Sequence, residues 1–136
     1  MGFDFGTQSI GVAIAQVVTG TAAPLSALKA TDGIPDWQKI DALNEEWQPD
    51  AVVVGLPLNM DGSYQPITYG AKKFANRLSN RFKMEINTHD ERLTSAEARE
   101  KLFELGGFKK LNKQKVDSVA ACLIIESWLN EYYERN

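Results

Sequence analysis

The sequence is poor in the residues that form covalent or metal cross-links: its 136 residues include one cysteine, Cys122, and one histidine, His89. A single cysteine excludes an intrachain disulfide framework, and the two residues are too few for a Cys/His zinc site. Small extracellular domains more often contain paired cysteines. The composition therefore favours a reducing cytoplasm, with Cys122 as core packing and His89 as a solvated residue at a strand end.

Long hydrophobic runs and an excess of basic residues are also missing. No apolar stretch approaches the length of a bilayer span, and the N-terminus lacks the basic segment and apolar run of a signal peptide. The net charge is −3 and the isoelectric point is about 5.2, so no global positive field attracts a polyanion. We therefore expect a protein that is neither exported nor membrane-embedded, and that contacts nucleic acid only locally.

The sequence does contain enough hydrophobic material for one core. Hydrophobic residues make up 43% of the chain and aromatic residues 10%, and 136 residues are too few to divide comfortably into two domains. There is no internal repeat, low-complexity tract or linker. We predict a single domain over residues 1–136.

Apolar periodicity and turn residues predict alternating strands and helices. Five strands are expected at 1–5, 10–18, 25–29, 51–54 and 84–89, the first two joined as a hairpin, with Pro24 limiting the third to an edge or a late start. Spacings of three and four predict helices over 36–48, 66–82, 94–105 and 116–132. Because the last two strands are reached through helices, the order predicts a mixed α/β sheet flanked by helices.

Carboxylates stand at the ends of these predicted elements. Asp4 lies on the first strand between two phenylalanines, Asp90 and Glu91 follow the fifth strand, and Asp117 opens the last helix. Burying an acid is costly unless its charge is compensated, and hard divalent cations prefer carboxylate oxygen. If the last helix packs beside the first strand, these acids can converge on a divalent metal ion, and with it on phosphoryl chemistry.

Each acid also has a simpler interpretation. Asp4 could cap a turn before Gly6, and Asp117 could complement the dipole of a helix N-terminus. Asp90 and Glu91 could be loop acids paired with Arg92. The joint placement of the acids, rather than any one of them, favours a metal site.

Basic residues crowd the segment before Asp117. Lys109, Lys110, Lys113 and Lys115 could form a solvated loop, or could position a nucleic-acid backbone beside the acids. Both interpretations stay open from the sequence. Lys72, Lys73 and Arg77 fit an ordinary exposed helix face.

Four motifs, in order along nearly the whole chain, resemble the YqgF/RuvX family. They are Phe3-Asp4-Phe5-Gly6-Thr7 leading to Ile10-Gly11-Val12-Ala13, Val54-Gly55-Leu56-Pro57-Leu58-Asn59-Met60-Asp61-Gly62, Asp90-Glu91-Arg92-Leu93-Thr94, and Lys115-Val116-Asp117-Ser118. The resemblance implies a ribonuclease H-like fold with a five-stranded sheet in the order 3-2-1-4-5 and strand 2 antiparallel. It also implies a nuclease, described in the family as a Holliday junction resolvase homologue and as a processor of the 5′ end of the small-subunit ribosomal RNA precursor.

By this resemblance, Asp4 would bridge two Mg²⁺ or Mn²⁺ ions with substrate bound, Asp117 would complete one coordination sphere, and Asp90 or Glu91 would supply the third acid. The products would carry a 5′-phosphate and a 3′-hydroxyl. Beside such a site, Arg92 and the lysines before Asp117 are the candidate nucleic-acid contacts. One departure stands out. Resolvases of the RuvC type place a glutamate on the fourth strand, where this sequence has Gly55.

Three alternatives to processing of ribosomal RNA remain. One is a Holliday junction resolvase acting on branched DNA, which would be expected to work as a symmetric dimer, whereas no feature guarantees more than a monomer or weak dimer here. Another is a non-catalytic RNA- or ribosome-binding module that keeps the acids for a structural metal. The last is an actin-like nucleotide-binding fragment, because Asp4-Phe5-Gly6-Thr7 resembles a phosphate hairpin.

Overall fold

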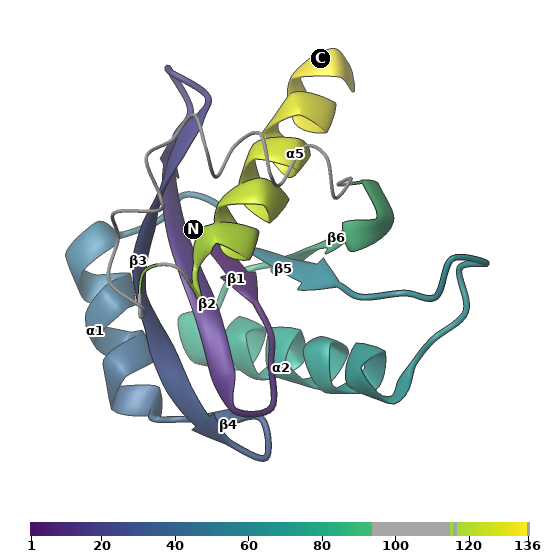
Figure 1. The fold of residues 1–136 in the computed structure, drawn as a ribbon. Coiled ribbons are helices and arrows are strands. Elements are labelled where there is room, and N and C mark those ends of the chain that lie inside the picture. Colours follow the sequence, from purple (N-terminus) through teal and green to yellow (C-terminus); the bar gives the residue numbers. More distant parts are fainter. Residues whose placement is uncertain (94–114, 116, 136) are drawn as a thin grey trace.

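A mixed sheet with helices on both faces forms the structure, a computed structural model that describes residues 1–93, 115 and 117–135 (Figure 1). The sheet has six strands in the order β4-β3-β2-β1-β5-β6. The strands are β1 (Gly2–Asp4), β2 (Ser9–Gln16), β3 (Thr21–Thr31), β4 (Ile34–Pro35), β5 (Val53–Leu56) and β6 (Asn87–Asp90). The helices are α1 (Trp37–Trp47), α2 (Pro66–Phe82) and α5 (Val119–Arg135), with a short 3-10 turn η1 (Glu91–Leu93) after β6.

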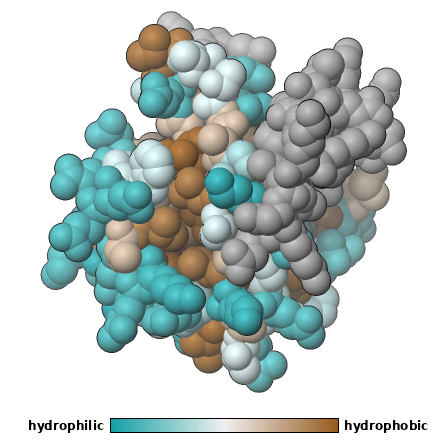
Figure 2. Space-filling model, turned by 60° about the vertical axis from the view of Figure 1, so that its left-hand side comes forward, coloured by the Kyte–Doolittle hydropathy of each residue, from teal (hydrophilic) through white to brown (hydrophobic). Residues whose placement is uncertain are grey.

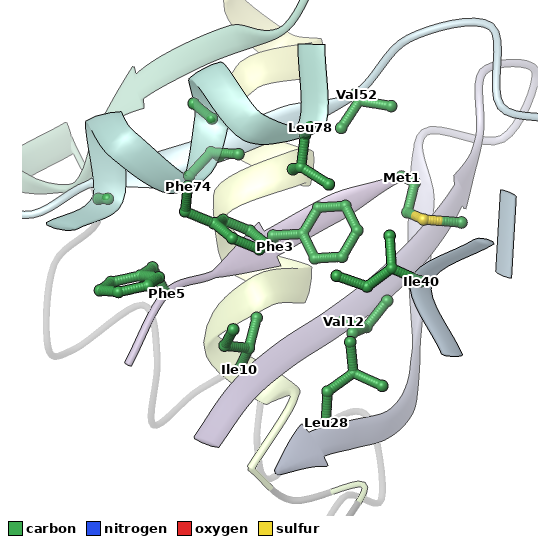
Figure 3. Close-up of a cluster of buried hydrophobic side chains, with 13 residues drawn as sticks. Met1, Phe3, Phe5, Ile10, Val12, Leu28, Ile40, Val52, Phe74 and Leu78 are labelled. Carbon is green, nitrogen blue, oxygen red and sulfur yellow. The ribbon is translucent and has the colours of Figure 1, made fainter. Parts of the chain in front are cut away.

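Strand alternation divides β1 between two cores. Phe3 points to the face covered by α1 and α2, where it packs edge-to-face on Phe74 of α2 with ring centroids 5.5 Å apart and lies near Ile40 of α1 (Figure 3). Gly2 and Asp4 point to the opposite face, because successive side chains of a strand alternate. On that face a Cβ on Gly2 would lie 2.9 Å from Cβ of Ile125, so α5 packs directly on the sheet.

The predicted sheet order is confirmed. Without the two-residue strand β4, the observed order β3-β2-β1-β5-β6 is the predicted 3-2-1-4-5, β1 and β2 are antiparallel, and β1–β5 and β5–β6 are parallel. Strand β4 was not predicted from the sequence. It pairs only with Ala30 and Thr31, at one end of β3.

Helices α1 and α2 agree with their predicted ranges to within one residue at each end. The Asp36 carboxylate accepts the Gln38 N–H at 3.0 Å and caps α1, and Gln48 ends it in the left-handed conformation. Pro66 begins α2, as its fixed φ favours.

Several boundaries differ from the prediction by two residues or more, among them those of β5, which spans Val53–Leu56 rather than 51–54. Strand β3 begins at Thr21 and includes Pro24, which is tolerated because β4 pairs only with the far end of that strand. Strand β6 begins at Asn87 rather than at residue 84, and α5 begins at Val119 rather than at residue 116. The predicted helix at 94–105 and the basic segment before residue 115 lie outside the described residues, and the single domain over residues 1–136 stays a prediction.

A shallow hollow of about 360 Å³ lies between β3 and α1, and its lining includes Leu25, Leu28, Leu43, Trp47 and Lys115. Figure 2 looks onto this side of the molecule and shows hydrophobic side chains gathered between hydrophilic ones. Among the described residues, no helix is both long and apolar enough to cross a membrane.

Candidate active site

Asp4 lies in a row of glycines that crosses the centre of the sheet. It is paired with Gly11 of β2, and continuing the parallel register of Phe3 with Val54 by one residue puts it beside Gly55 of β5. Residues in register on neighbouring strands point to the same face, which here is the α5 face. Asp4 is half-buried, and neither of its neighbours in this row has a side chain of its own.

Glu91 fills the space above Gly55. An added Cβ on Gly55 would lie 2.5 Å from Oε1 of Glu91 and 2.4 Å from Cδ1 of Ile124. The carboxylate of Glu91 therefore occupies the place that a side chain at position 55 would take. Since neighbouring strands are about 4.8 Å apart, this carboxylate lies roughly one strand spacing from Cβ of Asp4.

Asp117 comes to the same row from the other side. Its carbonyl oxygen lies 2.7 Å from where a Cβ on Gly11 would be, and Cβ of Asp4 lies 3.4 Å from that point. The fully buried Ser118 fixes this approach, because its Oγ accepts the Val12 N–H at 2.9 Å. The structure thus brings the backbone of Asp117 beside Asp4, with the Asp117 residue itself exposed in the turn before α5.

Asp90 is engaged differently from Glu91. The guanidinium of Arg92 donates to both Asp90 carboxylate oxygens at 2.7 to 3.1 Å, and the Arg92 backbone N–H donates to Oδ1 at 2.9 Å. These side-chain hydrogen bonds from Arg92 hold the pKa of Asp90 below its usual value. Arg92 also donates to the Met60 carbonyl at 3.1 Å, so the pair ties η1 to the loop after β5.

His89 is buried rather than solvated, which corrects the sequence-based interpretation. It is 3% exposed on β6, with Nε2 2.8 Å from Oγ of Ser127 and Nδ1 3.4 Å from Oε2 of Glu131. Both partners belong to α5. Through His89, the strand that precedes Glu91 is bonded to the helix that follows Asp117, a link that local sequence signals do not reveal.

The predicted nucleic-acid contacts are only partly described. Arg92 is exposed and already bonded to Asp90 and Met60, while Lys115 lines the hollow beside α1. Lys109, Lys110 and Lys113 lie outside the described residues.

The donor chemistry around Asp4 fits a hard divalent cation. Asp4 and Glu91 bring carboxylates to one face of the sheet, and the missing side chain of Gly55 lets Glu91 approach. Within residues 1–93, 115 and 117–135, however, no three Asp, Glu, His or Cys side chains are close enough to form a metal-binding group. The three-acid ligand set therefore stays a prediction.

Comparison with known proteins agrees with the motifs. A family model described as "RuvX: Holliday junction resolvase" matches residues 1–131. The chain belongs to the RuvX family. Among its relatives is a protein of Shewanella denitrificans, 61% identical over 134 residues that cover 98% of this chain and 95% of that protein. A protein of Pectobacterium carotovorum is 63% identical over 128 residues, covering 94% and 92%. Both are named "Putative pre-16S rRNA nuclease".

Solved structures establish the fold of this RuvX family member as ribonuclease H-like. The RuvC protein of Thermus thermophilus, solved in complex with a Holliday junction substrate, superimposes with a TM-score of 0.58 over 98% of this chain and 93% of that one, at 14% identity. A second Thermus thermophilus RuvC structure gives a TM-score of 0.55 at 11% identity, covering 98% and 95%. Both the predicted family and the predicted fold class are confirmed.

Proposed function

We propose that this protein is a metal-dependent nuclease that hydrolyses phosphodiester bonds in the 5′ processing of the small-subunit ribosomal RNA precursor. The observation that carries the proposal is the Glu91 carboxylate above Gly55, in the row that contains Asp4. Glu91, which follows β6, thus places a carboxylate where Gly55 of β5 has no side chain. Family membership and the names of the relatives support the choice of reaction.

Asp4 and Glu91 are the residues that we propose to hold the cation, with Asp117 as the third ligand. A bound divalent ion supplies Lewis-acid polarisation of the phosphate and a water of lowered pKa. The chain's own contribution is positional. Because Gly11 and Gly55 have no side chains, the Asp117 backbone and the Glu91 carboxylate can approach this row, and Ser118 fixes the turn that carries Asp117.

Asp90 has a supporting role in this proposal. Its two oxygens are occupied by Arg92, which also bonds to the Met60 carbonyl. A carboxylate held by a bidentate guanidinium pair is less available to a metal ion. Because the Glu91 carboxylate lies above Gly55 in the row that contains Asp4, we assign the second acid to Glu91 rather than to Asp90.

The proposed substrate is RNA in ribosomal precursor particles in the cytoplasm, bound by a monomer or weak dimer. Arg92 and the lysines at 109, 110, 113 and 115 are proposed backbone contacts, which would act locally because the net charge is −3. Resolution of branched DNA is the second candidate, favoured by the description of the matching family.

The test is cleavage of a panel of labelled substrates by the purified protein in Mg²⁺ or Mn²⁺: precursor RNA with its 5′ leader, single strands and four-way DNA junctions. We expect cleavage of the precursor RNA by the wild type and loss of at least 10²-fold in rate with Asp4→Asn. Faster cleavage of four-way junctions than of precursor RNA would favour the second candidate, resolution of branched DNA. Equal cleavage by wild type and Asp4→Asn would refute the site, and RNA binding with no cleavage would favour a non-catalytic module.

A further inference from the structure

An exposed aromatic pair lies where the loop after β5 enters α2, with Tyr64 in the loop and Tyr69 in the first turn of the helix. Tyr64 and Tyr69 pack edge-to-face with ring centroids 5.1 Å apart, and they are 39% and 64% exposed. Exposed tyrosines that pack mainly on each other contribute little to the core. Their position calls for another explanation.

Lys72 fixes this pair and adds a positive charge. Its ammonium lies 3.1 Å from the Tyr64 hydroxyl and 5.3 Å from the centroid of the Tyr64 ring. An ammonium has three N–H donors, so this contact leaves others for a ligand. Lys72 and the exposed Lys73 stand three and four residues after Tyr69 on α2, which puts both beside the Tyr69 ring on one helix face.

The loop is held rigidly where it meets the sheet. Leu58 pairs with Tyr64 in an antiparallel bridge, Asn59 and Ser63 bond through backbone and side chains, and the hydroxyl of the buried Thr68 donates to the Pro57 carbonyl. Figure 1 shows this loop projecting from the end of β5 and returning to α2. The aromatic pair is therefore prepositioned.

The distance from the acids suits a substrate that reaches both places. Pro57 is two residues from Gly55, and Tyr69 directly follows Thr68, which bonds to Pro57. Three chain steps of at most about 3.8 Å, together with roughly 6 to 7 Å between the Cα atoms of Pro57 and Thr68 across their hydrogen bond, put Cα of Tyr69 within roughly 18 Å of Cα of Gly55. Because the acids lie on the α5 face and α2 covers the other face, a nucleic acid that reaches both must cross the edge of the sheet where β5 ends.

We propose that Tyr69, supported by Tyr64, is a stacking platform for an unpaired base of the nucleic-acid substrate, and that Lys72 and Lys73 contact its phosphates. Bases of single strands stack on aromatic side chains, and basic residues beside them follow the backbone. A protein partner is the less suitable occupant, because specific protein interfaces bury roughly 1,200 Å² or more and two partly exposed rings offer about 200 Å². This inference rests on the proposed nuclease function, since it names that function's substrate as having a single-stranded segment.

The test measures binding rather than cleavage, so that the two proposals can fail separately. The binding protein is the Asp4→Asn variant, which keeps the full chain and leaves the labelled RNA intact. The probes are a single-stranded RNA and a fully paired duplex of the same length, read by fluorescence anisotropy. A second single-stranded RNA carries 2-aminopurine, whose fluorescence is quenched when it stacks.

In that background, we expect Tyr69→Ala to weaken binding of the single strand by about 5- to 100-fold and to abolish the quenching. Tyr69→Phe keeps the ring and should retain both. Lys72→Gln should reduce the slope of log affinity against log salt by about 0.7. Tyr132→Ala is the matched control, because Tyr132 is also exposed, at 49%, but stacks on Trp128 of α5.

Unchanged binding by Tyr69→Ala would overturn the platform, and equal loss in Tyr69→Phe would overturn stacking in favour of a role for the hydroxyl. Equal loss for the duplex would overturn the preference for unpaired bases. If Tyr69→Ala weakens binding but the wild type cuts no substrate, only the proposed nuclease function is refuted.

Discussion

Replacing Gly55 by alanine tests the placement of Glu91 with a single methyl group. The added Cβ would lie 2.5 Å from Oε1 of Glu91 and 2.4 Å from Cδ1 of Ile124. Ordinary contacts between such atoms are about 3.5 Å, so each neighbour must retreat by roughly 1 Å. Both are ends of flexible side chains, and we expect the fold to survive.

The two displacements have different consequences. Ile124 is 1% exposed, so moving it overpacks the core and should lower the unfolding free energy by about 1 to 3 kcal/mol. Alanine has less backbone entropy than glycine in the unfolded chain, which should offset about 0.4 to 1 kcal/mol of this loss. Moving the Glu91 carboxylate by roughly 1 Å should reduce cleavage about 10²-fold if this carboxylate is at the reacting centre.

A double variant separates these effects. Ile124→Val removes the Cδ1 atom that the new methyl group meets, so Gly55→Ala/Ile124→Val should regain stability while its cleavage rate stays low. Thermal unfolding and single-turnover cleavage of precursor RNA measure the two quantities. Full activity in Gly55→Ala, with its stability lowered, would refute the placement of Glu91 in the reaction.

Two further predictions concern the α5 face. Ser118→Ala should lower the unfolding free energy by about 1 to 3 kcal/mol in urea titration, because it leaves the buried Val12 N–H without its acceptor. The control is Ser26→Ala, which should have little effect because Ser26 is exposed. Equal stabilities of the two variants would contradict this prediction. Burial raises the pKa of the Cys122 thiol to about 12. Because the unfolded thiol loses its proton near pH 9 and the folded one does not, this site should cost about 1 kcal/mol of stability between pH 9 and 10, a loss absent from Cys122→Ala; identical pH profiles would refute it.

Local sequence signals predicted the parts of the site that one element supplies. The apolar neighbours of Asp4 place it on a central strand, where alternation turns it to the face opposite Phe3. The uninterrupted apolar run before Gly55 likewise predicted a buried parallel strand, which is β5. These features depend on spacing along the chain, which the sequence shows directly.

The choice between Asp90 and Glu91 could not be predicted in this way. It depends on Arg92 reaching the Met60 carbonyl, 32 residues away in the chain, and on η1 placing Glu91 across Gly55. The burial of His89 depends on α5 in the same manner. Tertiary packing sets these contacts. The sequence therefore does not show which of two adjacent acids faces the site.

The most direct test of the account is the single-turnover rate of precursor RNA cleavage in Mg²⁺ by two isosteric variants, Glu91→Gln and Asp90→Asn, each shown to be folded by its thermal transition. If Glu91 is the second acid of the site and Asp90 anchors the loop through Arg92, Glu91→Gln should lose at least 10²-fold in rate and Asp90→Asn should lose less than about tenfold. The reverse order, or equal losses, would contradict the assignment.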